Sequence, residues 1–292
     1  MSAPFGRVLT AMVTPFTGDG AVDLDRAAAL AERLVDAGND GLVISGTTGE
    51  APTTTDAEKE QLLRAVVDAV GGRAHVVAGV GTNNTAHSIE LARAAEKAGA
   101  TGLLVVTPYY NKPPQAGVIA HTRAVVDAVD LPTLLYDIPG RSGIALTSET
   151  IVTLAGHERI VGMKDAKLDL EATSWVLSRC DLAYYSGHDP WTLPLLAIGA
   201  VGVVGTSTHV TAGQTRELIE AFTAGDTARA RSLHEQLLPI YTGIFRTQGT
   251  ILVKAALDVL GFPVGGVRLP LVEATNAERE QLRTDLAAAG LL

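Results

Sequence analysis

The sequence predicts an α/β protein, a (β/α)8 TIM barrel with a C-terminal helical extension. Short apolar segments rich in β-branched residues recur between residues 8 and 222. Each segment ends in polar or glycine-rich residues, and an alanine-rich amphipathic segment follows it. Eight such pairs match the strands and helices of this barrel, whereas a doubly wound open sheet, the alternative fold, usually has fewer strands.

The apolar segments are almost continuously hydrophobic, which is typical of parallel strands buried on both faces. The expected strands, in chain order, are Val8–Phe16, Gly41–Gly46, His75–Gly81, Gly102–Tyr110, Thr133–Pro139, Ile160–Ala166, Leu182–His188 and Val201–Thr206.

The segments between these strands carry helix start and stop signals. Asp23 is a suitable N-cap residue, and Thr55 with Glu58 has the pattern of a capping box. Glycines suited to a left-handed helix end are Gly38, Gly99 and Gly199. The expected helices cover Asp23–Ala37, the segment after Thr55, Thr85–Ala98, Gln115–Val129, Ser148–Ala155, Leu168–Cys180, Trp191–Ile198 and Gln214–Phe222.

The last part of the chain, residues 226–292, is expected to add helices to a catalytic barrel of residues 1–225. A Gly/Pro-rich loop at Gly261–Pro270 interrupts this extension. The expected helices are Asp226–Tyr241, Thr250–Leu260 and Asn276–Ala289.

The composition argues against several function classes. The net charge is −9, so the chain lacks the excess of cations that displaces counterions from nucleic acid. One cysteine, Cys180, cannot build a disulfide framework and suits a reducing cytosol. No signal-peptide core is found, and no segment approaches the ~18 apolar residues of a membrane helix. We expect a cytoplasmic protein without nucleic-acid or membrane partners.

Two candidate catalytic residues lie near the carboxyl ends of expected strands, where barrels of this kind build their sites. Lys164 interrupts the apolar segment IVGMKDA, and burial would make its amine a nucleophile toward ketones. The alternative is a lysine that extends to solvent or pairs with Asp165; alternation with Gly162, which leaves room nearby, favours an interior position. Tyr136 needs a hydroxyl partner if it is buried, whether as a core residue or as a catalyst.

Other strand ends carry groups suited to anions. Arg141, expected in the loop PGRSG, could hold a carboxylate bidentately or remain solvated. Thr47 and Thr48 in SGTTGE lie between glycines before a helix, a pattern of anion-binding turns and of ordinary βα turns. The sequence has no clustered metal ligands, serine-nucleophile elbow or phosphate-binding loop, so Lys164 is the best candidate for covalent catalysis.

The motifs GTTGE, VTPYYN, YDIPGRSG and GMKDA, in this order, resemble those of the 4-hydroxy-tetrahydrodipicolinate (dihydrodipicolinate) synthases. These belong to the pyruvate-dependent aldolase superfamily, which also contains N-acetylneuraminate lyase. The resemblance covers essentially the whole chain. It implies a cofactor-free, metal-free lyase that condenses pyruvate with L-aspartate 4-semialdehyde in diaminopimelate and lysine biosynthesis.

The resemblance implies a role for each matching residue. Lys164 forms the Schiff base with pyruvate, and Tyr136 exchanges a proton near that imine. Thr48 and Tyr110 complete the proton relay, and Thr47 and Thr48 hold the pyruvate carboxylate. Val204 matches a position whose carbonyl faces pyruvate, and Arg141 matches the residue that binds the aldehyde's carboxylate. Tyr110 is implied to come from a neighbouring subunit of a homotetramer, a dimer of dimers.

Departures from the family pattern leave two alternatives open. SGHDP replaces a motif that more often has two aspartates, GVVGTSTHV differs near the end of the last strand, and Lys167 replaces a small residue. An aldolase for a 2-keto-3-deoxy sugar acid or sialic acid is one alternative, although Arg141 favours the synthase. A binding or regulatory barrel is the other, and the complete relay argues against it.

The resemblance also bears on feedback inhibition by lysine. Asn83 and Tyr109 match the allosteric site of lysine-sensitive relatives. His87 stands at the position of a glutamate that binds the ligand amines, and Lys59 at that of a histidine. We therefore expect weak or no inhibition by lysine.

Overall fold

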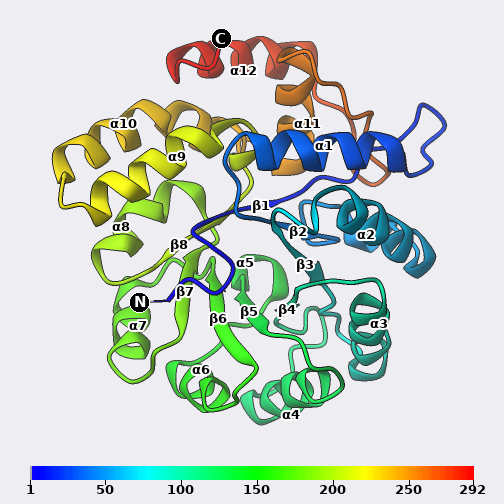
Figure 1. Cartoon of the computed structure of the whole chain (residues 1–292), viewed down its shortest axis with the longest axis vertical. Coiled ribbons are helices and arrows are strands. Elements are labelled where there is room, and N and C mark those ends of the chain that lie inside the picture. The colour runs from blue at the N-terminus through cyan, green and yellow to red at the C-terminus, as the bar shows by residue number, and fades with distance from the viewer. Residues whose placement is uncertain (1) are drawn as a thin grey trace.

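Eight parallel strands form a closed barrel in chain order, with helices around it, which confirms the predicted fold (Figure 1). The computed structural model describes residues 2–292. The strands are β1 Val8–Ala11, β2 Gly41–Ile44, β3 His75–Gly79, β4 Gly102–Val106, β5 Thr133–Asp137, β6 Ile160–Asp165, β7 Ala183–Ser186 and β8 Gly202–Gly205.

Each strand overlaps its predicted segment but ends earlier, because the polar residues beyond the ladder form the loops of the site. The barrel helices are α1 Leu24–Asp36, α2 Asp56–Val70, α3 Thr85–Lys97, α4 Gln115–Val126, α6 Ser148–Ala155, α7 Leu170–Leu177, α8 Thr192–Ala197 and α9 Thr208–Thr223. Three short helices were not predicted: η1 Ala51–Thr53, α5 Pro139–Ser142 and η2 Asp189–Trp191.

The expected helix signals are present. The Asp23 side chain accepts a hydrogen bond from the Arg26 amide, and Thr55 and Glu58 form a complete capping box. The predicted helix-terminating glycines have φ values of 107°, 88° and 111° at Gly38, Gly99 and Gly199.

Residues 226–292 form α10 Thr227–Gly243, α11 Gly249–Val259 and α12 Asn276–Ala288, close to the predicted helices. Figure 1 shows these helices at one side of the barrel, near α9 and α1. Buried Leu237 and Val253 of the extension share a hydrophobic cluster with Leu30 and Leu62 of the barrel helices. The extension thus completes the core on that side. No helix in residues 2–292 has the length and apolar character to cross a membrane.

Candidate active site

Lys164 lies inside the barrel near the end of β6, and its side chain is only 5% exposed. The ladder places Tyr136 of β5 opposite it. The Lys164 Nζ lies 4.5 Å from the centroid of the Tyr136 ring, and Tyr136 is also buried. Lys164 therefore lies in the barrel interior and does not extend to solvent. Its amine and the Tyr136 phenol share one buried space.

Burial lowers the pKa of Lys164 to about 8, because it disfavours the ammonium ion. The carboxylate of Asp189 opposes this shift, and the guanidinium of Arg141 adds to it. An appreciable fraction of the amine is consequently neutral near physiological pH, as a nucleophile toward a carbonyl carbon requires.

Burial raises the pKa of Tyr136 to about 12, which keeps the phenol protonated. Arg141 and the nearby Thr47 hydroxyl act in the opposite direction, while Asp137 adds to the increase. The phenol can therefore donate a proton close to Lys164, and the cation and hydroxyl beside it would favour the phenolate that results.

A cavity of about 170 Å³ opens onto Lys164. Its lining includes four of the other predicted residues: Thr47, Thr48, Tyr136 and Arg141. The Thr48 and Thr206 hydroxyl oxygens lie 3.3 Å apart beside it. Val204 is buried among the apolar side chains of the barrel interior and does not line the cavity; Thr206, two residues later, does.

Arg141 lies in helix α5, which corrects the expectation of a loop. Pro139 occupies the first turn of this helix, and Gly143 ends it with a φ of 79°. Pro fits the first helical turn and Gly the left-handed end, so the sequence PGRSG contains both signals. The exposed guanidinium can reach a carboxylate at the cavity mouth.

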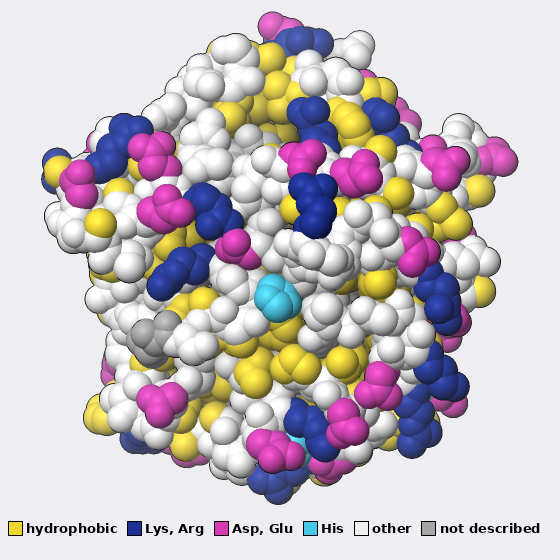
Figure 2. Space-filling view, in the orientation of Figure 1, with side chains coloured by type: hydrophobic (Ala, Val, Ile, Leu, Met, Phe, Trp, Pro, Cys, Tyr) yellow, Lys and Arg dark blue, Asp and Glu magenta, His cyan; other side chains and the backbone are white. Residues whose placement is uncertain are grey.

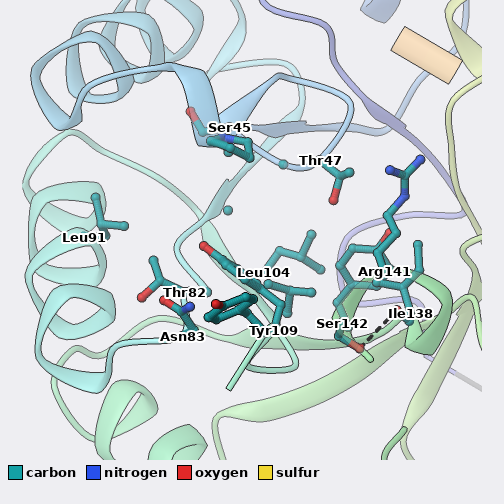
Figure 3. A pocket seen from close by; sticks show the side chains of 18 of the residues that line it. Ser45, Thr47, Thr82, Asn83, Leu91, Leu104, Tyr109, Ile138, Arg141 and Ser142 are labelled. Atoms are coloured by element: carbon teal, nitrogen blue, oxygen red, sulfur yellow. Dashed lines mark hydrogen bonds between the residues drawn. The ribbon is translucent and has the colours of Figure 1, made fainter. Parts of the chain in front are cut away.

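A second cavity, of about 850 Å³, shares Thr47, Tyr136 and Arg141 with the first. Figure 3 shows Thr47 and Arg141 on one side of it, away from Thr82 and Asn83. Tyr110 also borders it, but its side chain is 88% exposed and its φ is 73°. Within a single chain, the phenol of Tyr110 is therefore not buried with Lys164 as Tyr136 is.

Several of the residues around Lys164 were not identified from the sequence. Asp189, noted in the sequence analysis only within the SGHDP departure from the family pattern, is buried and accepts hydrogen bonds from the Ser207 amide and hydroxyl at the start of α9. Its charge also acts on Lys164. A Cβ on Gly187 would lie 3.0 Å from the Lys164 side chain, whereas one on Gly162 would first meet other residues. Gly187, rather than Gly162, therefore leaves room beside the Lys164 side chain, at its Cγ.

Residues 2–292 contain no group of three His, Cys, Asp or Glu side chains arranged to hold a metal ion. His188 instead packs against the ring of Phe245, with centroids 5.8 Å apart.

His209 is buried; its Nδ1 lies 2.7 Å from the Thr206 carbonyl oxygen, and its Nε2 accepts a hydrogen bond from the Val13 amide. Burial lowers the pKa of His209 to about 4, so this ring stays neutral and joins the segment after β1 to the start of α9.

The chain is similar to known proteins over its whole length. The profile of the Dihydrodipicolinate synthetase family matches residues 4–289. The 4-hydroxy-tetrahydrodipicolinate synthase of Acidothermus cellulolyticus is 70% identical over 288 residues, 99% of this chain and 94% of that protein. The 4-hydroxy-tetrahydrodipicolinate synthase 2 of Streptomyces coelicolor is 62% identical, with 99% and 96% covered. The crystal structure of DHDPS from Cyanidioschyzon merolae with lysine bound superimposes with a TM-score of 0.98 at 43% identity, covering both chains completely.

Proposed function

The chain belongs to the dihydrodipicolinate synthetase family, and on this premise we propose that it joins pyruvate to L-aspartate 4-semialdehyde as a 4-hydroxy-tetrahydrodipicolinate synthase. It is a lyase of the Schiff-base-forming class I aldolase type. The main support for Schiff-base chemistry is the buried Lys164 amine opposite Tyr136. We propose a location in the cytoplasm, which the single cysteine suits.

The neutral amine of Lys164 attacks the C2 carbonyl of pyruvate, and loss of water gives the imine. Protonation of the departing oxygen calls for an acid, which the Tyr136 phenol supplies. The imine withdraws electrons, so the methyl carbon gives a proton to the Tyr136 phenolate left by that step, and the adduct becomes an enamine. Thr47 and Thr48 hold the pyruvate carboxylate.

The enamine carbon then attacks the aldehyde carbon of L-aspartate 4-semialdehyde and forms the new C–C bond. Arg141 binds the carboxylate of this substrate at the cavity mouth through charge-assisted hydrogen bonds. The substrate amine attacks the imine carbon, which closes the ring and releases the Lys164 amine. Hydroxyl groups supply and accept the protons in these steps, so the reaction requires no cofactor.

The exposed Tyr110 supports a shared site in an assembly. A phenol that is 88% exposed on a strained backbone has no packing within its own chain to hold it there. We propose that it enters the site of a neighbouring subunit, completes the relay with Thr48 and Tyr136, and is buried in the interface of a dimer. Two such dimers form the tetramer. Sedimentation should show an oligomer at assay concentrations, and a fully active monomer would contradict this part of the proposal.

Borohydride trapping tests the covalent step. With pyruvate and borohydride, intact-mass analysis should show one adduct per chain, and it should be absent in Lys164→Ala. A coupled assay with a panel of aldehydes then tests the second substrate. Turnover with L-aspartate 4-semialdehyde is expected, and Arg141→Ala should lower it far more than adduct formation. An adduct with turnover only on sugar-derived aldehydes would assign the chain to another branch of the aldolases.

A further inference from the structure

We infer that the C-terminal extension is a working part of the pyruvate site, in which Thr250 and Lys254 of α11 position the turn that carries Thr47 and Thr48. This inference rests on the proposed function, because it concerns how that turn meets pyruvate. It assigns Thr250 and Lys254 as positioning residues.

The first contact is made to Thr48 itself. The Thr250 hydroxyl donates a hydrogen bond to the Thr48 carbonyl oxygen, with 3.0 Å between the oxygens. Both residues are buried, and both line the cavity that opens onto Lys164. A carbonyl in such a place needs a donor, and here the donor comes from a helix 202 residues further along the chain.

The second contact fixes the turn two residues later. Glu50 is buried with a left-handed φ of 57°, a conformation that costs free energy unless its surroundings enforce it. Its carboxylate accepts hydrogen bonds from the Lys254 ammonium, at 2.8 Å, and from the Arg268 amide, at 2.9 Å. Both donors belong to the extension, so the extension itself holds Glu50 in this conformation.

Lys254 is in turn fixed on all sides. Its ammonium also donates to the Gly266 carbonyl at 2.5 Å and lies 4.3 Å from the ring centroid of Phe16. A buried charge with this many partners has little freedom to move, and the paired carboxylate is held equally firmly. The turn between β2 and η1 is thus held from α11 at two points, Thr48 and Glu50.

The barrel also contacts this turn. The Thr14 hydroxyl donates to the Gly49 carbonyl at 2.6 Å, and the Thr48 and Thr206 hydroxyl oxygens are 3.3 Å apart. Within residues 2–225, the Thr48 carbonyl has no hydrogen-bond donor. Without Thr250, the peptide after Thr48 can rotate toward another donor, and the two hydroxyls assigned to pyruvate would move with it. A displacement of ~1 Å in a catalytic group can cost ~100-fold in rate.

Thr250→Val tests the inference, because it removes the hydroxyl while keeping nearly the same shape. We expect kcat/KM for pyruvate to fall about tenfold or more, with KM for the aldehyde nearly unchanged. Thr250→Ser should restore most of the loss. The matched control is Thr215→Val, which removes a buried hydroxyl that lies 3.0 Å from the Tyr241 hydroxyl oxygen, between α9 and α10. It should leave both kinetic constants unchanged.

A second variant tests the ion pair. Glu50→Gln/Lys254→Met removes both charges together, so no single buried charge remains, and the same selective loss in kcat/KM for pyruvate is expected. The inference is overturned if Thr250→Val behaves like Thr215→Val, or if serine fails to rescue a folded protein. A wild-type enzyme that forms no borohydride-trapped adduct would instead refute the proposed function.

Discussion

The burial of Lys164 makes the pH dependence of imine formation predictable. Only the neutral amine attacks the ketone, and burial brings the pKa of this lysine down to about 8. The rate of adduct formation should therefore rise with pH and level off above about 8, near the folded-state pKa. Quenching with borohydride at short times over a pH series measures this rate. A rate that keeps rising until pH about 10, the range of a solvated lysine, would contradict the assigned environment.

Asp137, next to Tyr136 in β5, gives a second prediction. Its Oδ2 accepts the Leu146 amide, and its Oδ1 is buried without a hydrogen-bond partner in residues 2–292. Asp165 lies opposite it across the ladder. Burial raises its pKa to about 7, and Asp165 adds to the shift. The folded protein therefore holds a proton that the unfolded chain releases above pH about 4, and stability falls as pH rises from about 4 to about 7.

Asp137→Asn removes this penalty, since an amide cannot ionise. The variant should gain thermal stability relative to the wild type as pH increases through that window, with each pKa unit worth about 1.4 kcal/mol at most. Thermal midpoints at pH about 5 and about 8 measure the difference, and Asp68→Asn on the exposed face of α2 is the control. A gain independent of pH would show that Asp137 is ionised in the folded state over the whole range.

At the residue scale, the sequence predicts what is local. The alternation of β6 indicated an interior Lys164, and Tyr136 was placed on the matching strand. Asp189, Thr206 and Thr250 could not be found in this way. Their contacts with the site join segments far apart in the chain, such as the 158 residues between Thr48 and Thr206, and they are hydroxyl or carboxyl groups without a distinctive spacing.

The connection between β6 and α7 allows a prediction at the scale of an element. Leu168 has a φ of 63°, lies at the mouth of the cavity and is 42% exposed. A left-handed backbone costs a residue with a Cβ about 1 kcal/mol, and its exposed side chain recovers little of this by packing. Leu168→Gly should therefore be about 1 kcal/mol more favourable for stability than the same exchange at an unstrained position, a difference of a few degrees in the melting temperature.

The same exchange at Val272 is the control. Val272 is 63% exposed, and its backbone is outside the left-handed region. Glycine there increases the freedom of the unfolded chain without relieving strain, so Val272→Gly should be neutral or destabilising. Differential scanning calorimetry of both variants makes the comparison. Equal changes at the two positions would mean that the Leu168 conformation carries no cost.

Element boundaries show where prediction from sequence stops. Helix α9 begins at Thr208, six residues before its predicted start at Gln214. Its first turn is threonine-rich, which lowers intrinsic helix propensity, but Asp189 accepts hydrogen bonds from the Ser207 amide and hydroxyl at its beginning. The Asp189 carboxylate, which stabilises the start of α9, follows the end of a different strand, β7. Tertiary contacts therefore extend this helix beyond what the local sequence indicates.

At the scale of the whole molecule, the barrel was predictable because its eightfold repeat is a property of the hydrophobic pattern. The closing contact between β1 and β8 follows from that count and needs no special residues. Charged side chains do not follow the repeat of the hydrophobic pattern. Acidic and basic side chains are interspersed over the face in Figure 2, and the net charge is −9. Lys164 and Arg141 supply the local cations that anionic substrates require within this acidic molecule.

The large cavity beside the site leads to the last prediction, that L-lysine inhibits weakly or not at all. It is lined by Asp56, Lys59, Asn83, His87 and Tyr109, four of which are the positions compared above with the lysine site of relatives. Asp56 could attract a ligand ammonium, but His87 Nε2 lies 2.9 Å and Lys59 Nζ 3.6 Å from its carboxylate oxygens. The Lys59 amine therefore already pairs with the carboxylate that a ligand amine would need.

A ligand lysine would therefore lose a charge-assisted hydrogen bond and meet a like charge. Losing such a bond is worth ~1.5–3 kcal/mol, which is more than tenfold in affinity. A dose–response of the purified enzyme should show half-inhibition at or above about 1 mM, if any. The double variant Lys59→His/His87→Glu, which restores a free carboxylate and removes the competing amine, should gain sensitivity while Lys59→His alone gains little. Strong inhibition of the unmodified enzyme would show that Asp56 binds the ligand amine despite its two present partners.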